Sequence, residues 1–274
     1  MKQYRVEDTL LYVENLSVGY GNKLIIKDIN LTEFNVTREG HDSTGQVIAF
    51  IGRSGRGKST LFKALTGLLK PASGQIMITD MTTDVKDDAK NITEGDIGFV
   101  DQKYTLFRHE TIEQICRYAL RKSKLSKPEK EALINKYLSE WGLEEHRKKY
   151  SCELSGGQRQ RTAIIEQMLT SKHFMVFDEP FSGLDVGNIE KVKASFDRIS
   201  ADNEYNTIIF STHDIKLAIE MADSIYILGF PEGETQVSTI VKHYDLKEMG
   251  LAWTEYDDNH RKLYTDIKEL LLRS

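Results

Sequence analysis

Apolar and polar residues alternate along residues 11–36, in the two stretches LYVENLSVGY and LIIKDINLTEF. The tripeptide Tyr20-Gly21-Asn22 interrupts this alternation. Alternation is typical of strands with one buried face, and a glycine beside an asparagine is typical of a turn. This region therefore predicts antiparallel strands joined by a turn. The polar, glycine-bearing residues 37–45 predict a loop after them.

The chain then changes from alternation to longer apolar runs. The run QVIAFIG predicts a buried strand. Helical periodicity begins at Lys58 and continues to about Leu69, where Pro71 would stop it. A short strand is expected at residues 75–79. The polar and acidic residues 82–95 are expected to form an exposed loop or hairpin.

Residues 108–150 have a different composition, because they are rich in Lys, Glu, Leu and Tyr and contain glycine only at Gly142. Ser126 and Glu129 have the spacing of a capping box, which predicts the start of a helix. The apolar residues that follow fall on one helical face. They are Leu133, Ile134, Tyr137, Leu138 and Trp141. This segment is therefore expected to be a helical insert.

Strands and helices alternate in the second half of the chain. Apolar, strand-like runs occupy residues 173–177, 207–210 and 224–228, and helical segments occupy residues 157–170, 187–202 and 214–222. This order predicts a largely parallel α/β sheet. Residues 231–274 are expected to form an appendix, with a polar stretch followed by a helix from Arg261 to Leu271.

Composition excludes several classes of protein. The 274 residues include 37 Lys and Arg against 42 Asp and Glu, a formal net charge of −5. A protein that binds nucleic acid mainly through its charge would be basic, so no nucleic-acid partner is expected. No apolar run approaches the roughly 20 residues of a membrane span, and MKQYRVEDTL lacks the apolar stretch of a secretion signal. The cysteines, Cys116 and Cys152, predict neither a metal cluster nor a disulfide framework, and a cytoplasmic location is expected.

The segment GRSGRGKST fits the phosphate-loop pattern G-x-x-x-x-G-K-[ST], between a predicted strand and a predicted helix. Glycines let the backbone wrap around a phosphate, and the start of the helix adds a favourable dipole. Lys58 would reach the β- and γ-phosphates, and the Ser59 hydroxyl would bind Mg²⁺. A glycine-rich turn with a chance lysine is the alternative, and the flanking elements argue against it. The candidate nucleotide contacts are Gly52, Ser54, Gly55, Gly57, Lys58, Ser59 and Thr60.

Two carboxylates, Asp178 and Glu179, follow the apolar run FMVF. Acids at the carboxyl end of such a strand face the ligand crevice of a parallel sheet. Asp178 suits a role in binding Mg²⁺, and Glu179 suits the polarisation of a water that attacks the γ-phosphate. Surface turns also often carry acidic residues, so the pair indicates a nucleotide site only in combination with the phosphate loop.

The segment Leu154-Ser155-Gly156-Gly157-Gln158 resembles the signature motif of the nucleotide-binding subunits of ABC transporters, which other P-loop ATPases lack. In that family the motif caps the γ-phosphate held by the other subunit. Ser155, Gly156, Gly157 and Gln158 are therefore further candidates for contact with ATP. A polar loop that merely caps a helix would explain the glycines, but not their coincidence with the other motifs.

Further motifs follow in the order of that family. Gln102 resembles the Q-loop glutamine, which contacts Mg²⁺ and water. Residues 104–107 beyond it resemble the segment that contacts the membrane subunit. Residues 182–185 resemble the D-loop, which crosses the dimer interface, and Asp185 is expected near ATP. Taken singly each motif has an ordinary structural alternative, and their order and spacing carry the resemblance.

His213 resembles the switch histidine, which contacts the γ-phosphate, and Tyr20 resembles the aromatic residue that stacks on adenine. The chain departs from the family in three places. Residues 34–45 are longer than usual, which weakens the assignment of Tyr20. The phosphate loop carries Arg53 and Arg56, which would either face solvent or add positive charge near the phosphates. The D-loop has a glycine where alanine is frequent.

The resemblance covers about residues 10–230 and implies the ABC ATPase fold. This fold is an α/β P-loop core with a mixed sheet, an antiparallel β subdomain and an inserted helical subdomain. The implied division is an ABC ATPase domain at 1–230, with a core of 1–102 and 159–230 and a helical subdomain of about 103–158, then a partly helical C-terminal extension at 231–274.

The resemblance also implies an ATPase that uses Mg²⁺. Its implied catalytic residues are Lys58, Gln102, Glu179 and His213, and its implied Mg²⁺ contacts are Ser59, Gln102 and Asp178. Two ABC subunits, identical or different, would close on ATP and drive a substrate through separate transmembrane permease subunits, at the inner face of the cell membrane. The pattern resembles prokaryotic importers, some of which use a solute-binding protein. An ABC ATPase acting in translation, DNA maintenance or regulation is the alternative.

Overall fold

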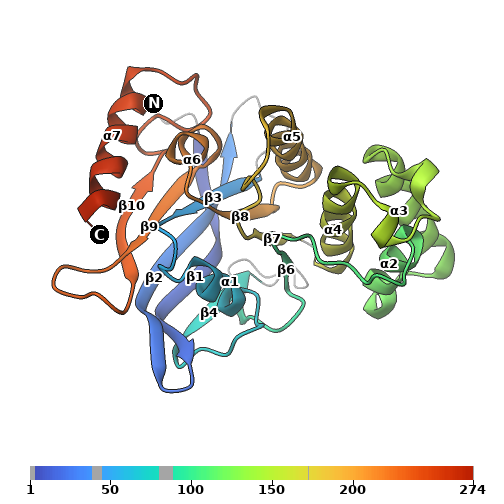
Figure 1. Ribbon diagram of the computed structural model, residues 1–274, viewed down its shortest axis with the longest axis horizontal. Coiled ribbons are helices and arrows are strands. Elements are labelled where there is room, and N and C mark those ends of the chain that lie inside the picture. The colour runs from blue at the N-terminus through green and yellow to red at the C-terminus, as the bar shows by residue number, and fades with distance from the viewer. Residues whose placement is uncertain (1–3, 39–44, 80–88, 172, 274) are drawn as a thin grey trace.

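Two β-sheets form the centre of the protein (Figure 1). The structure, a computed structural model, describes residues 4–38, 45–79, 89–171 and 173–273. The antiparallel sheet has the strand order β2-β1-β4-β5 and consists of β1 (Tyr4–Tyr20), β2 (Lys23–Arg38), β4 (Ser73–Thr79) and β5 (Ala89–Asn91). The main sheet has the order β10-β9-β3-β8-β7-β6 and consists of β3 (Gln46–Ile51), β6 (Ile97–Val100), β7 (Phe174–Phe177), β8 (Thr207–Thr212), β9 (Ser224–Gly229) and β10 (Thr239–Asp245).

The predicted antiparallel pair with its turn after Tyr20 is confirmed as β1 and β2. Both strands are longer than predicted. Thr37 and Arg38, which were expected in a loop, end β2 because β1 begins early enough for Arg5 and Tyr4 to pair with them. The rest of that expected loop, up to residue 44, lies outside the described residues, as does the first half of the expected loop or hairpin at 82–95. Its later part forms β5, which pairs with β4 as a hairpin would.

The main sheet is parallel from β6 to β9, and only β10 runs antiparallel to its neighbour. Strands β3, β7, β8 and β9 of this sheet are largely apolar because both of their faces are covered. Ile48 and Phe50 of β3 belong to a core shared with α1 and the antiparallel sheet. Ala49 and Ile51 of the same strand belong to a second core, formed with the helices of the opposite face. The predicted parallel α/β sheet is thus confirmed.

The helices differ from the predicted segments mainly at their ends. They are α1 (Lys58–Leu65), α2 (Ile112–Ala119), α3 (Lys127–Glu140), α4 (Gly156–Thr170), α5 (Val186–Asp202), α6 (Ile215–Met221) and α7 (Asp258–Arg273). Helix α1 was expected to reach Leu69, but it ends at Leu65. The reason is Gly67, which follows the Thr66 cap and has a φ of 72°. A residue in this left-handed conformation commonly ends a helix.

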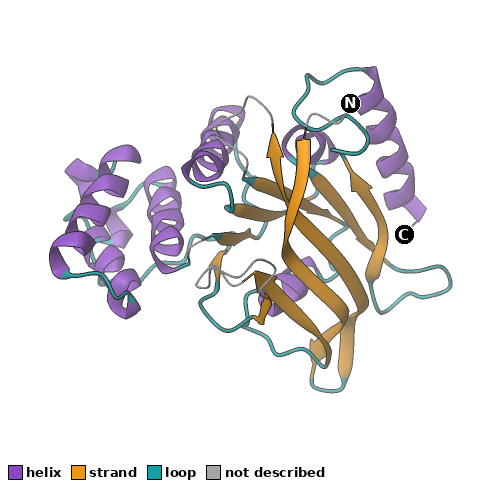
Figure 2. Ribbon diagram, turned by 180° about the vertical axis from the view of Figure 1, so that it is seen from behind, coloured by secondary structure: helices purple, strands orange, loops and turns teal. Residues whose placement is uncertain are grey.

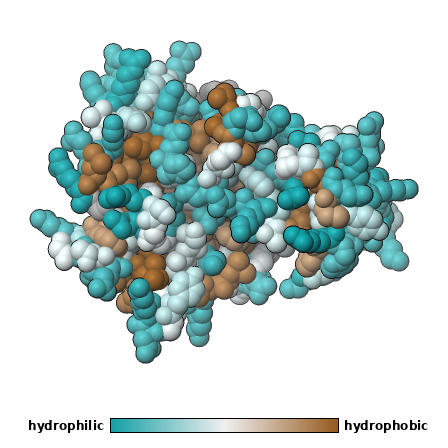
Figure 3. All heavy atoms as spheres, in the orientation of Figure 1, coloured by the Kyte–Doolittle hydropathy of each residue, from teal (hydrophilic) through white to brown (hydrophobic). Residues whose placement is uncertain are grey.

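The predicted helical insert is present, and Figures 1 and 2 both show α2 and α3 set to one side of the sheets, with α4 between. The predicted capping box is confirmed, because Ser126 accepts from the Glu129 N–H and the Glu129 carboxylate accepts from the Ser126 N–H. Ile134 and Trp141 of the predicted helical face are buried. Figure 3 shows a mostly hydrophilic surface over this region, in keeping with its many Lys and Glu residues.

Residues 231–274 contain a helix, as the sequence predicts, and also a strand within the stretch that was predicted only as polar. Strand β10 pairs with β9 and extends the main sheet, so the sheet continues past residue 230. Helix α7 begins at Asp258 rather than Arg261 and buries Leu263 and Ile267 in the core of the helix-covered face. Among the described residues, no helix is long and apolar enough to cross a membrane.

Candidate functional site

Four parallel strands of the main sheet carry the predicted site residues at their carboxyl ends. The phosphate loop follows β3, Gln102 follows β6, Glu179 follows β7 and His213 follows β8. Because these strands are parallel and adjacent, their carboxyl ends meet at one edge of the sheet, where α/β proteins bind ligands. The topology alone therefore brings together residues that are far apart in the sequence.

The phosphate loop needs its glycines for two physical reasons. Gly55 and Gly57 have φ angles of 81° and 86°, which residues with a Cβ rarely adopt. A Cβ on Gly57 would also lie 2.6 Å from Cγ2 of Ile26 in β2. The loop is thus fitted against the antiparallel sheet, and it leads directly into α1, whose first backbone N–H groups have no partner within the helix.

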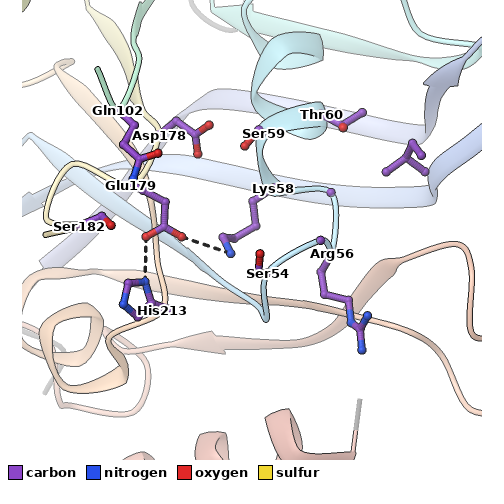
Figure 4. A pocket seen from close by; sticks show the side chains of 13 residues that line it. Ser54, Arg56, Lys58, Ser59, Thr60, Gln102, Asp178, Glu179, Ser182 and His213 are labelled. Carbon is purple, nitrogen blue, oxygen red and sulfur yellow. Dashed lines mark hydrogen bonds and ion pairs between the residues drawn. The ribbon is translucent and has the colours of Figure 1, made fainter. Parts of the chain in front are cut away.

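Lys58 begins α1 and is only 8% exposed. Its Nζ donates to the carbonyl oxygen of Gly52 at 2.7 Å and lies 3.3 Å from Oε1 of Glu179. The loop therefore closes on itself, and its lysine is held at the end of β7 (Figure 4). Gly52 does not line the pocket, but it holds Lys58 through this hydrogen bond.

The Glu179 carboxylate lies between two basic side chains, because its Oε2 is 3.1 Å from Nδ1 of His213 (Figure 4). The backbone at Glu179 has a φ of 51°, an uncommon value for a residue with a side chain. Its N–H donates to the Ser211 hydroxyl at 2.8 Å, and that hydroxyl donates to Oδ1 of Asp178 at 2.8 Å. Strand β8 thus fixes both acids of β7.

These residues surround one pocket of about 490 Å³. Ten residues predicted for the site line it: Ser54, Gly55, Gly57, Lys58, Ser59, Thr60, Gln102, Asp178, Glu179 and His213. Ile25, Arg56 and Ser182 line it as well. Sequence reasoning missed Ile25, because nothing in the alternation of β2 distinguishes it. It left Arg56 undecided between solvent and the phosphate site.

Arg56 lines the pocket, but Figure 4 shows its guanidinium pointing away from Glu179 and His213. The guanidinium carbon lies 3.7 Å from the ring centre of Phe230, which follows β9. Such a cation–π contact fixes a flexible side chain over a ring. Arg56 therefore adds a positive charge to one wall of the pocket.

The remaining predicted residues lie outside this pocket. Tyr20, at the end of β1, is half exposed. Ser155 and Gln158 form a capping box at the start of α4, and Asp185 caps α5 by accepting from the Asn188 N–H. According to the resemblance, the signature loop contacts the ATP that a second subunit holds. Within this chain, Ser155 and Gln158 of the loop cap helix α4.

Ser59, Gln102 and Asp178 supply a hydroxyl, an amide and a carboxylate to the same pocket. Mg²⁺ prefers oxygen ligands of these kinds together with phosphate oxygens, so the donor set fits this ion. In the part of the chain that the structure describes, no three His, Cys, Asp or Glu side chains gather into a metal site. Mg²⁺ bound beside these side chains would take its other ligands from water and phosphate oxygens.

Comparison with known proteins agrees with this geometry. The sequence pattern of the ABC transporter family matches residues 41–182, just over half of the chain. The sulfate/thiosulfate import ATP-binding protein CysA of Thermosynechococcus vestitus is 32% identical over 233 residues, 85% of this chain and 65% of that protein. The chain thus spans less than two thirds of that relative. The probable ABC transporter ATP-binding protein PEB1C of Campylobacter jejuni is 32% identical over 220 residues, 80% of this chain and 86% of the relative.

A solved structure shows the same fold. That of cbiO1 from Clostridium perfringens, described as part of the ABC transporter complex cbiONQ, superposes with a TM-score of 0.68 at 27% identity. The match covers 90% of this chain and 92% of that chain. The chain belongs to the ABC transporter family and has the ABC ATPase fold.

Proposed function

We propose that this chain is an ATP-hydrolysing subunit that closes with a second ABC subunit on ATP and powers import through separate transmembrane subunits. The observation that carries the proposal is the position of Glu179, between Lys58 and His213 in the phosphate pocket. A carboxylate there can orient a water, and two adjacent basic groups can offset charge on the γ-phosphate.

Each side chain has a distinct part in the proposed reaction. Lys58 and the N–H groups of the loop bind the β- and γ-phosphates. Glu179 accepts a proton from the attacking water, and His213 stabilises the charge that develops on the transferred group. Bound Mg²⁺, held by Ser59, Gln102 and Asp178, would neutralise phosphate charge.

A second subunit completes the proposed site. The start of α4 offers a serine hydroxyl and backbone N–H groups at the positive end of a helix, which suits a phosphate. The space around Gly156 is open, because a Cβ there would meet nothing within 4 Å. ATP held by one subunit could therefore approach the Ser155 loop of another and stabilise the closed pair by contacting both.

The proposed membrane partner binds the helical region. Phe107 and Tyr118 are exposed there, with their rings in edge-to-face contact and their centroids 5.3 Å apart. Exposed aromatic pairs are typical of protein–protein contacts. Phe107 belongs to the segment that resembles the membrane-contacting part of the family. Two comparisons support a membrane partner and import: the CysA relatives are named as import proteins, and cbiO1 is described as part of a transporter complex.

Phosphate release by the purified chain tests hydrolysis, with Glu179→Gln as the inactive comparison. The same variant, tagged in its native host, loaded with ATP and extracted from solubilised membranes, tests transport. Recovery of a permease by mass spectrometry supports the proposal. Recovery of only ribosomal or DNA-bound proteins favours the alternative of an ABC ATPase without transport work.

A further inference from the structure

The Tyr104 hydroxyl joins two segments that are far apart in the sequence. It donates to the carbonyl oxygen of Pro180 at 3.0 Å and accepts from Nε2 of Gln160 at 3.0 Å. Pro180 directly follows Glu179, and Gln160 lies in the second turn of α4, the helix that begins at the signature loop. Pro180 and Gln160 are both buried and Tyr104 is half-buried, so each hydrogen bond is partly shielded from water.

The Asp101 carboxylate accepts three hydrogen bonds from the chain around Tyr104. Oδ1 of Asp101 accepts from the N–H groups of Lys103 and Thr105, both at 3.0 Å, and Oδ2 accepts from the Thr105 hydroxyl at 2.6 Å. Tyr104 itself has a φ of 49°, an uncommon conformation for a bulky residue. The segment after Gln102 thus packs Tyr104 and Leu106 against the core, with Tyr104 in a strained backbone conformation.

The turn after β7 is held by several hydrogen bonds, of which Tyr104 makes one. The Glu179 N–H donates to the Ser211 hydroxyl, and its carbonyl accepts from the Ser182 N–H at 3.1 Å. Tyr104 holds the next carbonyl, that of Pro180. Because Glu179 also has a positive φ, its carboxylate direction depends on these bonds.

We propose that Tyr104 is a positioning residue that keeps Glu179 aligned and ties its turn to α4, an inference that rests on the hydrolysis proposed above. Rotation of the helical region, to which the resemblance assigns residues 103–158, would move Tyr104 relative to Gln160 and Pro180 and so act on the turn of Glu179 through this hydroxyl.

Tyr104→Phe tests the inference, because it removes the hydroxyl and keeps the ring. We expect kcat to fall about tenfold while KM for ATP stays within about twofold, since the lost bonds orient Glu179 and do not bind nucleotide. Tyr150→Phe is the matched control, because that tyrosine is exposed and does not line the pocket. A normal kcat for Tyr104→Phe, an equal loss in the control, or a loss confined to KM would each overturn the inference.

Gln160→Glu tests the same pair of hydrogen bonds while Tyr104 stays intact. It is the deciding variant if Tyr104→Phe does not fold. The new carboxylate only accepts, so it would draw the single hydroxyl proton away from Pro180. We expect kcat to fall again, and the defect to shrink toward about pH 5 as the carboxyl regains a proton to donate. Normal turnover at neutral pH would refute the inference. Failure of the proposed function would look different from failure of this inference. In that case the wild-type protein would not hydrolyse ATP, or the Glu179→Gln variant would hydrolyse ATP as fast as the wild type.

Discussion

Lys58 Nζ lies 3.3 Å from Oε1 of Glu179, so one ion pair joins the phosphate loop after β3 to the acid after β7. Both side chains are largely buried, which strengthens their attraction relative to a surface pair. A triphosphate carries more negative charge than a carboxylate and would compete for Lys58. Binding of the nucleotide would then release Glu179 to accept from water.

Glu179→Gln should lower the rate of ATP hydrolysis by about 10²- to 10⁴-fold, the usual contribution of a general base. ATP binding should persist, because an amide keeps the shape of the side chain and removes a negative charge near the phosphates. Phosphate release and equilibrium binding of a fluorescent ATP analogue measure the two effects. Glu190→Gln, at an exposed position of α5, is the control. A Glu179→Gln protein that turns over ATP normally would remove Glu179 from the proposed mechanism.

Arg56→Ala should raise KM for ATP severalfold with little change in kcat. The reason is that Arg56 places a positive charge on a wall of the pocket, away from the reacting groups at Glu179. Arg53→Ala is a close control, since Arg53 belongs to the same loop, is exposed and does not line the pocket. Steady-state kinetics at low and high salt would compare them. Equal effects from both arginines would indicate only general charge attraction.

Gly57→Ala should destabilise the protein more than Gly55→Ala. Both positions have a positive φ, which costs a residue with a Cβ about 1–2 kcal/mol. At Gly57 the new methyl would also come within 2.6 Å of Ile26, whereas at Gly55 it would meet nothing within 4 Å. Urea unfolding of the two variants measures the difference. Equal losses would mean that the contact with β2 relaxes without cost.

The stability of the protein should depend on Asp223. Burial raises the pKa of this carboxyl to about 6, although Lys247, the Val47 N–H and Arg38 act to lower it. The folded pKa lies above the unfolded value of about 3.9, so the stabilising effect of protonation is full below about pH 4 and is lost as pH rises through about 6.

Asp223→Asn keeps an acceptor for the Val47 N–H and removes the charge. Between about pH 4 and 7, the free energy of unfolding of the wild type should fall relative to this variant by about 2–3 kcal/mol. Urea unfolding across this range measures the difference. Asp258→Asn, at a side chain that is 82% exposed, should show no such trend. A constant difference between wild type and Asp223→Asn would contradict the prediction.

Sequence patterns predicted the elements whose causes are local. The apolar run QVIAFIG is readable in the sequence itself, and the Ser126–Glu129 capping box acts within one helical turn. Strand β10 was missed, since it is an edge strand in which only Tyr244 is buried. Its polar composition resembles that of a loop.

The candidate site was predictable as a set of residues but not as a geometry. The phosphate loop and the acids after β7 have recognisable spacings, and the sheet brings them to one pocket. Ile25 lines the pocket because the antiparallel sheet packs against the phosphate loop. No local sequence pattern encodes this packing. The contacts of Tyr20, Asp185 and the signature loop with ATP stay predictions, as does the assignment of roles to the pocket residues.

The order of synthesis bears on when the pocket can form. Strand β3 carries the phosphate loop near the start of the chain, yet both of its sheet neighbours, β8 and β9, begin at or after residue 207. The backbone of Ser238 is also hydrogen-bonded to Ile25 and Lys27 of β2, beside the pocket. A ribosome must therefore release most of the chain before the first strand of the site has a sheet to join. Contacts of such long sequence separation slow folding, so nucleotide would bind only after β8 and β9 have joined β3.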